Sequence, residues 1–344
     1  MNASALPRAA VSAGTLISLC CAVLCGCSGG HTVASSTGSS ASAANAALVQ
    51  EGPQLGYLWS SSEQSLRPIL GVPGASQLGS PVAEPGSYIA AAASARSGEA
   101  ILEDKAGDLD LMSVPVGSPL PLSGVHVAGI AQFVFSPSGV NAVVFVPGQN
   151  TAFLVTGLSA TASTQQPQVQ ALTSASAMTA AAVSDTGQVV SATGSNPTTL
   201  TLLTGNNAPV ASLGGFGGIA FLPGGSDLLA VDSLHSVLTL IHGNGAAAQT
   251  FASSSFQSPF AVAASQDGNT AVVANGGDTS VVRVDLTNAA NPMRIPCACQ
   301  PDRLMPLAGN AVFAMTGPGN APAWVVDASA SMPRTLFIPA VVKQ

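Results

Sequence analysis

The sequence predicts an all-β protein, a seven-bladed β-propeller of four-stranded blades. Three observations predict this fold class. Short Val, Leu, Ala and Thr runs lie between turn residues, and the chain contains 36 glycines and 24 prolines, which favours short strands joined by turns. Strand-turn-strand stretches recur at intervals of about 40 residues. Hydrophobic residues make up 47% of the chain, yet no run after residue 50 could span a membrane, so they belong to a core.

Residues 1–26 are predicted to be an export signal. Arg8 is the only charged side chain before Glu51, and an uncharged run of sixteen residues, Ala9–Leu24, follows it. A basic start followed by an apolar stretch is typical of a secretory signal peptide. The alternative is a transmembrane anchor, but such a helix needs about 20 residues and is usually followed by positive charges, which are missing here.

Residues 27–50 are predicted to be an acylated cysteine and a flexible tether. The run from Leu24 to Cys27, Leu-Cys-Gly-Cys, resembles the lipobox of bacterial lipoproteins, whose last cysteine is acylated and becomes the N-terminus. The resemblance implies a lipid on Cys27, contact with a membrane through that anchor, and a place at the bacterial cell envelope, in the outer membrane or at the cell surface. The Ser/Gly/Ala tract that follows has no charged side chain and too little apolar bulk to offset its ordering entropy.

Residues 51–344 are predicted to be the propeller domain, with seven units. The glycines of equivalent turns recur at intervals of 41, 48, 38, 43 and 41 residues, at Gly98, Gly139, Gly187, Gly225, Gly268 and Gly309. Counting back 42 residues from Gly98 reaches Gly56, where an aromatic strand and a second apolar strand follow. A period of about 40 to 45 residues with short strands is typical of propeller blades.

The closure of the ring is the open question of this prediction. The first unit has no clear small-residue strand before Gly56. Either residues 46–50 supply that strand, or the C-terminal run 335–342 crosses over to pair there. If the run 335–342 does not cross over, we expect it to be an outer strand of the last blade.

Residue composition within the units fits the same geometry. First strands are crowded with small residues, as expected where neighbouring blades converge, in Ala90–Ala95, Ala180–Ser184 and Ala261–Ser265. Later strands, such as AVVFV, are continuous apolar runs. Such runs are expected because each blade is covered on both faces by its neighbours.

One unit carries a family resemblance. Residues 262–286, VAASQDGNTAVVANGGDTSVVRVDL, combine a Ser-x-Asp-Gly turn, a Val-Ala-Asn strand end and a third strand that ends in Asp. This unit resembles the YVTN-type repeat of bacterial surface proteins, a lactonase-like or WD-like propeller repeat. The resemblance implies a propeller over roughly residues 52–344. Proteins with this repeat include binding proteins of unknown ligand and, more distantly, lactonase-like enzymes.

Several motifs have structural interpretations. Asp185 with Gly187, and Asp267 with Gly268, are interpreted as turn formers, because Asp bonds the backbone two residues on and Gly supplies a positive φ. The glycines of Leu213–Phe221 match no phosphate-binding fingerprint and are interpreted as residues of loops between blades. The acidic run 103–110 does not fit a calcium loop and is interpreted as a solvated hairpin.

No catalytic, cofactor-binding or metal-binding residue is predicted, and no cofactor. None of the histidines has an Asp, Glu or Cys at ligand spacing in the sequence; they are His31, His126, His235 and His242. No serine lies in a Gly-x-Ser-x-Gly motif. The net charge of −7 and the lack of a basic patch make nucleic acid an unexpected partner.

Cys297 and Cys299 are a possible disulfide. Three of the six cysteines would leave with the signal and Cys27 would be acylated, so the mature chain keeps only this pair. A strained disulfide between residues two apart and a pair of free thiols both remain open. A zinc site is disfavoured, because zinc takes four ligands and the sequence offers no second cysteine pair.

These features lead to a hypothesis about function. The protein is expected to be a lipid-anchored, extracytoplasmic binding or scaffolding module rather than an enzyme, with a protein or glycan partner in the cell envelope. The alternative is a lactonase-like hydrolase with a site at the mouth of the central channel. That alternative needs polar residues on the innermost strands, which are instead mostly Ala, Val and Phe.

Overall fold

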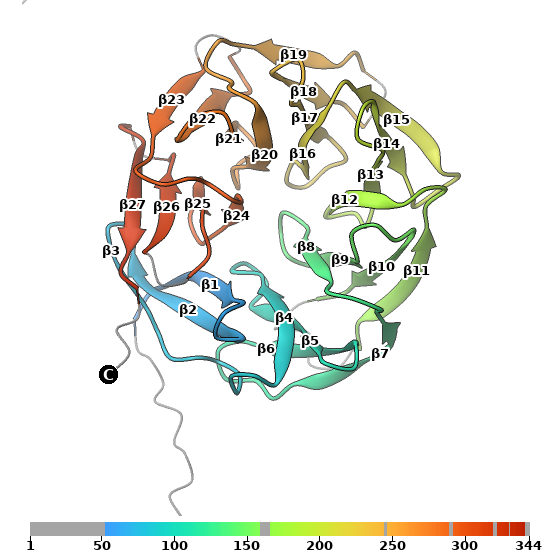
Figure 1. Cartoon of the computed structure of the whole chain (residues 1–344), viewed down its shortest axis with the longest axis vertical. Coiled ribbons are helices and arrows are strands. Elements are labelled where there is room, and N and C mark those ends of the chain that lie inside the picture. Colours follow the sequence, from blue (N-terminus) through green and yellow to red (C-terminus); the bar gives the residue numbers. More distant parts are fainter. Residues whose placement is uncertain are drawn as a thin grey trace, which may run out of the picture. The chain divides into compact units, whose positions relative to one another are not determined.

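The computed structural model describes residues 52–158, 166–243, 246–288, 292–318, 322–329 and 331–340. All of them lie in the compact unit Ala47–Gln344, and the other unit, Met1–Ala46, lies outside the described residues. Within these ranges the chain forms 27 strands in seven antiparallel sheets. The sheets are blades arranged in a ring (Figure 1), which confirms the predicted all-β, seven-bladed propeller.

Each blade is built from consecutive strands. The first blade has three strands within the described residues, and the other six have four. Blades 1 to 3 contain β1 (Gln54–Ser60), β2 (Ser65–Val72) and β3 (Ala75–Leu78); β4 (Tyr88–Ala93), β5 (Glu99–Asp104), β6 (Asp108–Ser113) and β7 (Leu120–His126); and β8 (Gln132–Phe135), β9 (Asn141–Phe145), β10 (Thr151–Thr156) and β11 (Gln168–Thr173). Blades 4 and 5 contain β12 (Met178–Val183), β13 (Val189–Thr193), β14 (Thr198–Leu202) and β15 (Ala208–Leu213); and β16 (Phe216–Phe221), β17 (Leu228–Asp232), β18 (Val237–Ile241) and β19 (Gln249–Ala252). Blades 6 and 7 contain β20 (Pro259–Ala264), β21 (Thr270–Asn275), β22 (Ser280–Asp285) and β23 (Met293–Pro296); and β24 (Met305–Pro306), β25 (Val312–Ala314), β26 (Ala323–Asp327) and β27 (Arg334–Ile338).

The two faces of the ring differ in their connections. In blades 2 to 7 the chain starts at the innermost strand and moves outward one strand at a time (Figure 1). We call the face where each innermost strand begins the loop face, because it carries the loops that join one blade to the next. We call the opposite face, where the innermost strand turns back into the second strand, the turn face.

In the first blade, β1 takes the place of a second strand. The N–H of Gly71, within β2, donates to the carbonyl of Pro53, just before β1, at 2.7 Å. In blade 2 the N–H of Val114, just after the third strand, donates in the same way to the carbonyl of Gly98, just before the second strand, at 2.9 Å. Residues 46–50, one of the two expected sources of the missing innermost strand, lie outside the described residues.

The core lies between blades, as the continuous apolar runs predict. One cluster of buried side chains joins blades 5 and 6 and includes Leu229, Val231 and Phe256 of blade 5 with Val273 and Val282 of blade 6. Both faces of the second and third strands are therefore covered. This packing accounts for an apolar chain whose strands lack polar alternation.

The ring closes by packing of blade 7 against blade 1. Leu55 and Leu58 of β1 share a buried cluster with Leu307 and Val325 of the last blade. The N–H of Ala308 donates to the carbonyl of Leu55 at 2.6 Å. β27 pairs with β26 as the outer strand of blade 7, one of the two alternatives expected for the C-terminal run. No described segment is a helix long and apolar enough to cross a membrane.

Candidate functional site

A cavity of about 470 Å³ opens on the loop face at the beginning of the innermost strands of blades 4, 5 and 6. Its walls come from β12 and β16 and from the loops around them. The lining residues are Thr179, Gly194, Ser195, Asn196, Gly215, Phe216, Ser233, Leu234 and Ser258. None of these side chains is charged, so the cavity combines hydroxyl and amide groups with the apolar surfaces of Phe216 and Leu234.

Asp232, the last residue of β17, holds two walls of this cavity in place. Its carboxylate accepts the backbone N–H groups of Gly214 at 2.6 Å, Gly215 at 3.2 Å and Leu234 at 3.0 Å. Burial alone would raise the pKa of Asp232, but hydrogen bonds from the His235 ring and from the N–H groups of His235, Gly214 and Gly215 lower it to about 2. The carboxylate is therefore charged at neutral pH and fixes the loop before β16.

Asn275, the last residue of β21, plays the same part in the next blade. Its Oδ1 accepts the N–H of Gln257 at 3.0 Å, and its Nδ2 donates to the carbonyl of Ser255 at 2.9 Å. These bonds hold the loop that leads to Ser258 on the cavity wall. Equivalent strand ends in blades 5 and 6 thus shape neighbouring parts of one cavity, which pre-organises it for a ligand.

The lining can bind a ligand that is uncharged and partly apolar. The hydroxyl of Thr179 donates to the carbonyl of Ala192 at 3.1 Å, which leaves its oxygen lone pairs as acceptors. The side chain of Leu234 is 61% exposed and offers an apolar contact surface at the rim. A volume of this size lies within the range of small-molecule sites, about 300 to 1,000 Å³.

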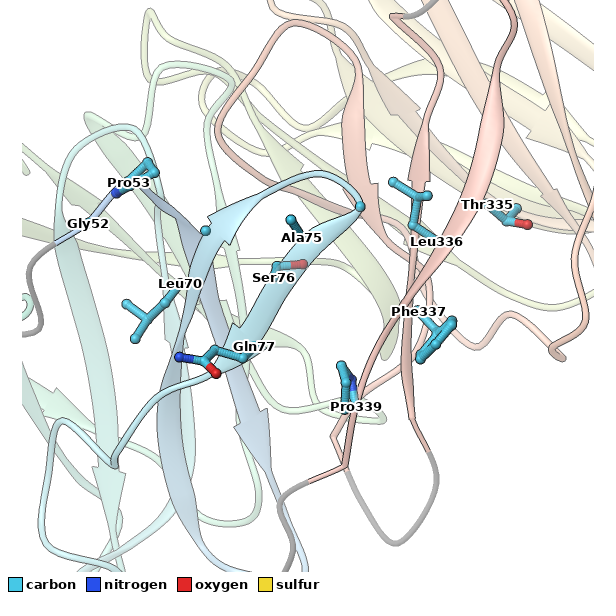
Figure 2. Close-up of a pocket in the computed structure, with 12 residues that line it drawn as sticks. Gly52, Pro53, Leu70, Ala75, Ser76, Gln77, Thr335, Leu336, Phe337 and Pro339 are labelled. Atoms are coloured by element: carbon cyan, nitrogen blue, oxygen red, sulfur yellow. The ribbon is translucent and has the colours of Figure 1, made fainter. Parts of the chain in front are cut away.

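A second cavity, of about 620 Å³, lies at the seam between the first and last blades. Figure 2 shows Ala75, Ser76 and Gln77 of β3 on one side, with Thr335, Leu336 and Phe337 of β27 facing them. Gly52 and Pro339, near the two ends of the described domain, also line it. This cavity lies at the rim of the ring, where the outer strands of blades 1 and 7 meet.

Each of the three histidines in the described ranges has an acidic partner, contrary to the sequence-based expectation, and His31 lies outside those ranges. The Nδ1 atom of His235 lies 2.8 Å from Asp232, that of His242 lies 2.9 Å from Asp227, and that of His126 lies 3.0 Å from Asp108. The residues of the last two pairs lie 15 and 18 positions apart in the sequence, so no local spacing shows them. The first pair is three residues apart in a turn, a spacing that would have revealed it. No group of three or more His, Cys, Asp or Glu side chains able to hold a metal ion occurs among the described residues.

The predicted cysteine sites have different outcomes. Cys27 lies outside the described residues, so its lipid attachment stays a prediction. Cys297 and Cys299 are joined in the structure by a disulfide with a Cα–Cα distance of 5.0 Å. The bond lies in the loop between β23 and β24, on the loop face, where the N–H of Cys297 donates to the carbonyl of Thr279 at 2.8 Å.

The turn interpretation is right for both glycines and for Asp267, whereas the Asp185 carboxylate accepts from Ser138 and Gly224 of neighbouring blades. Gly187 and Gly268 have φ values of +81° and +73°, and Asp267 accepts the N–H of Asn269 at 3.0 Å. The sequence did not show that these turns also bond neighbouring blades. Asn310 of blade 7 donates to the Asp267 carboxylate at 2.9 Å.

The hairpin interpretation of residues 103–110 is right for the turn and wrong for its first residue. Asp104 accepts the N–H groups of Ala106 and Asp108 at 2.8 and 3.0 Å, as a turn former does. Glu103, however, is completely buried and accepts the N–H of Ala131 at 2.8 Å. Because both faces of a blade are buried, its strands show no alternation of polar and apolar residues. The sequence therefore could not indicate whether the Glu103 side chain is buried or exposed.

Glycines of the stretch 213–221 contribute to the loop-face cavity. Gly214 and Gly215 lie in the loop between blades 4 and 5, as predicted, whereas Gly217 and Gly218 lie within β16. A Cβ atom on Gly214 would lie 2.4 Å from the His235 ring, so a side chain at this position would displace that ring from Asp232. No motif in the sequence marks this loop as part of a site.

Comparisons with known proteins support the fold and nothing finer. No family model matches the chain, and no curated protein matches it. The β-propeller domain of Myceliophteria thermophila Cps50 (Swd1) is similar with a TM-score of 0.53 at 12% identity, over 74% of this chain and 88% of that one. A chain of the mitotic checkpoint complex has a TM-score of 0.51 at 13% identity, over 72% and 76%.

Enzymes are also among the similar structures. Virginiamycin B lyase from Staphylococcus aureus has a TM-score of 0.50 at 12% identity, over 72% of this chain and 82% of that one. At such identities the similarity shows a shared fold, and the neighbours include both an enzyme and a member of a protein complex. The chain is therefore a β-propeller, a fold compatible with a binding or scaffolding module.

Proposed function

We propose that this protein is a lipid-anchored, extracytoplasmic β-propeller that binds an uncharged protein segment or glycan of the bacterial cell envelope. The observation that carries the proposal is the loop-face cavity, whose lining is entirely uncharged. Its walls are held by Asp232 and Asn275, so it exists before a ligand arrives. The partner class follows from the lining, because neutral hydrogen-bonding groups beside apolar surface match peptide groups or sugar rings.

The surroundings of the cavity support an uncharged partner. Five loops of the loop face contain no charged residue, namely 127–131, 146–150, 174–177, 194–197 and 253–258. Other loops of that face carry charges of both signs, among them Lys105, Asp278, Asp302 and Arg303. Only 7% of the residues of the whole chain are charged. Long-range steering of an ionic ligand would need a cluster of one sign of charge at the site, which these loops do not offer.

Binding to an array of neutral glycans and uncharged peptides tests this function. The test compares wild-type protein with Leu234→Asp, which places a charge at the cavity rim, and Leu120→Asp as a matched control. The two leucines are 61% and 59% exposed, and Leu120 lies on an outer strand far along the chain from the cavity residues. We expect Leu234→Asp alone to weaken binding by at least about tenfold, since burying an unpaired charge costs more than 1.4 kcal/mol. Equal binding by both variants would contradict the proposal.

The anchor is tested separately. The Leu-Cys-Gly-Cys run that ends at Cys27 supports a lipid there, with residues 1–26 as the signal and residues 27–50 as the acylated cysteine and tether. We expect Cys27→Ser to move the protein from the detergent phase to the aqueous phase, because one or two acyl chains supply the membrane affinity. A variant that partitions into detergent as the wild type does would overturn the anchor and leave the cavity proposal standing.

A second candidate function is hydrolysis or elimination at the same cavity. It is favoured by the pair of His235 and Asp232, a carboxylate-oriented histidine next to the lining residues Ser233 and Leu234. Virginiamycin B lyase is among the structural neighbours, and a histidine-to-alanine variant of that enzyme is catalytically inactive. Assays with quinupristin and with simple lactones decide between the two functions. Turnover by the wild type that His235→Ala abolishes would establish the enzyme.

A further inference from the structure

The loop 297–304 carries the disulfide from blade 6 to blade 7. It connects β23, the outer strand of one blade, with β24, the innermost strand of the next (Figure 1). Both blades hold it through backbone hydrogen bonds. The N–H of Cys297 donates to the carbonyl of Thr279 in blade 6 at 2.8 Å. The N–H of Asp302 donates to the carbonyl of Met315 in blade 7 at 2.9 Å. The two neighbouring blades therefore fix the course of this loop.

The disulfide itself adds little to this arrangement. Its two cysteines lie two positions apart, with Ala298 alone between them. The stabilisation that a cross-link gives to a fold increases with the length of chain that it closes. Both cysteines also belong to the same loop, so the bond joins no two blades. Stability of the ring is thus a weak reason for this pair of cysteines.

The two sulfur-bearing residues differ in their exposure to solvent. Cys297 is only 6% exposed and belongs to a buried cluster with Ile295 and Phe313. Cys299 lies at the edge of the same cluster and is only partly buried, and both of its neighbours in the chain are exposed. An external thiolate attacks the sulfur that it can reach. Cys299 is therefore the cysteine that such a thiolate attacks, and Cys297 is the one that leaves.

Opening of this disulfide leaves its two thiols close together. The Cα atoms of Cys297 and Cys299 are 5.0 Å apart. Even in a fully extended chain, residues two positions apart are separated by at most about 7 Å. Since the backbone of Cys297 is also bonded to blade 6, the bond can open and close without movement of the blades.

We propose that Cys297 and Cys299 form a site of thiol–disulfide exchange, at which the chain passes its disulfide to a dithiol of another protein. The first thiolate of that protein bonds to the Sγ atom of Cys299. The bond between the two cysteines breaks, and Cys297 leaves as a thiolate that takes up a proton.

The second thiolate of the other protein completes the transfer. It attacks the other protein's own sulfur in the mixed disulfide, and Cys299 leaves as a thiolate that takes up a proton. The other protein loses two electrons and two protons, and this chain gains them. Exchange with a more oxidising protein disulfide restores the starting state. Neither step uses the loop-face cavity or a lipid on Cys27.

Transfer to a model dithiol tests this site. The probe is an uncharged peptide with two cysteines, and mass spectrometry of acid-quenched samples follows its oxidation. The protein is the full chain in which only the pair remains, with Cys20→Ser, Cys21→Ser, Cys25→Ser and Cys27→Ser. We expect the folded protein to oxidise the peptide at a rate within about tenfold of that of the same protein unfolded in urea. A folded protein that reacts more than about tenfold more slowly would overturn the proposal, because the fold would then protect the bond.

Two single variants test the direction of attack, with the disulfide form of the same peptide as the probe. Cys297→Ser keeps the partly exposed thiol and Cys299→Ser keeps the buried one. We expect the first variant to form a mixed disulfide with the peptide at least about tenfold faster than the second. Equal rates, or a faster reaction of the second variant, would contradict the assigned roles.

Hydrogen exchange separates an exchange site from a bond that holds the fold. We expect the strands on either side of the loop, β23 and β25, to exchange at the same rate in the oxidised and the reduced protein. Faster exchange of these strands after reduction would show that the disulfide stabilises the two blades, and it would overturn the proposal.

Discussion

At the residue scale, Asp185 links three neighbouring blades through one carboxylate. It lies in the turn of blade 4, and its Oδ1 accepts the N–H and the hydroxyl of Ser138 in blade 3 at 2.7 and 2.6 Å. Its Oδ2 accepts the N–H of Gly224 in blade 5 at 2.8 Å. Asp267 and Asn310 join blades 6 and 7 in a similar way. Hydrogen bonds on the turn face therefore supplement the apolar packing between blades.

Loss of the Asp185 charge should weaken this link. Burial alone would raise the pKa of Asp185, but hydrogen bonds from Ser138 and Gly224 outweigh it and lower the pKa. Because the folded pKa lies below the unfolded value, the stabilisation is present above about pH 4 and is lost as pH falls through the folded pKa. Asp185→Asn should lower the free energy of unfolding at pH 7 by about 2 kcal/mol, and the difference should shrink toward pH 2.

Urea unfolding at pH 7 and pH 2.5 measures this effect. Asp302→Asn is the control, since its carboxylate is 53% exposed and pairs only with the adjacent Arg303 among its described contacts. The control should change the free energy by less than about 0.5 kcal/mol. A loss at Asp185 that is the same at both pH values would contradict the ionic origin of the effect.

Glu103 has the opposite dependence on pH. Burial raises its pKa, and the hydrogen bond from Ala131 only partly offsets this. Its Oε1 has no hydrogen-bond partner among the described residues. A raised folded pKa in an acid means that the wild type loses stability as pH rises through that pKa. Glu103→Gln should therefore match the wild type near pH 4 and exceed it at pH 8 by about 1 kcal/mol or more.

The measurement is the difference in unfolding free energy between variant and wild type across that pH range. Glu84→Gln, at an exposed position, is the control and should give a flat difference. A flat difference for Glu103→Gln as well would show that the carboxyl is solvated in the folded state.

At the element scale, the glycine spacing identified the blades because each turn after an innermost strand has the same geometry. The count of seven units is correct, and Gly56 lies in β1 just after the position of the missing turn. Partners such as Ser138 and Gly224 of Asp185 could not be predicted, since they lie 47 and 39 residues away in the chain. Only the closed ring brings these turns together.

The loop-face cavity was likewise not predictable from sequence. It is assembled from the loops of three blades, and its lining residues are Ser, Thr, Asn, Gly, Phe and Leu in no motif. The polar anchors Asp232 and Asn275 are a regular feature of strand ends in blades 5 and 6, but their acceptor role depends on the loop of the preceding blade. A comparison of strand-end residues between units is the signal that could have drawn attention to them.

The disulfide belongs to the loop that enters blade 7. Asp302 in this loop donates its N–H to the carbonyl of Met315 at 2.9 Å, so the loop is attached to the neighbouring blade end. Mass spectrometry of the non-reduced protein should find the peptide with Cys297 and Cys299 lighter by two hydrogens than after reduction. Two alkylated thiols in protein isolated without reductant would show that the bond is absent in solution.

At the scale of the whole molecule, a ring of blades packed on both faces explains a chain that is apolar without spanning a membrane. Its hydrophobic side chains pack between the blades. The proposed lipid would keep the propeller at the envelope, so that a weak ligand there is met at high local concentration.

Site-specific photo-crosslinking in living cells tests the central claim most directly, that the loop-face cavity is where this protein binds its partner. A photoreactive phenylalanine analogue replaces Leu234 at the cavity rim or Leu120 on the outer strand of blade 2, positions that are 61% and 59% exposed. We predict a discrete adduct, of one mass, from position 234 and none from position 120. No adduct at position 234, or the same adduct from both positions, would contradict the account.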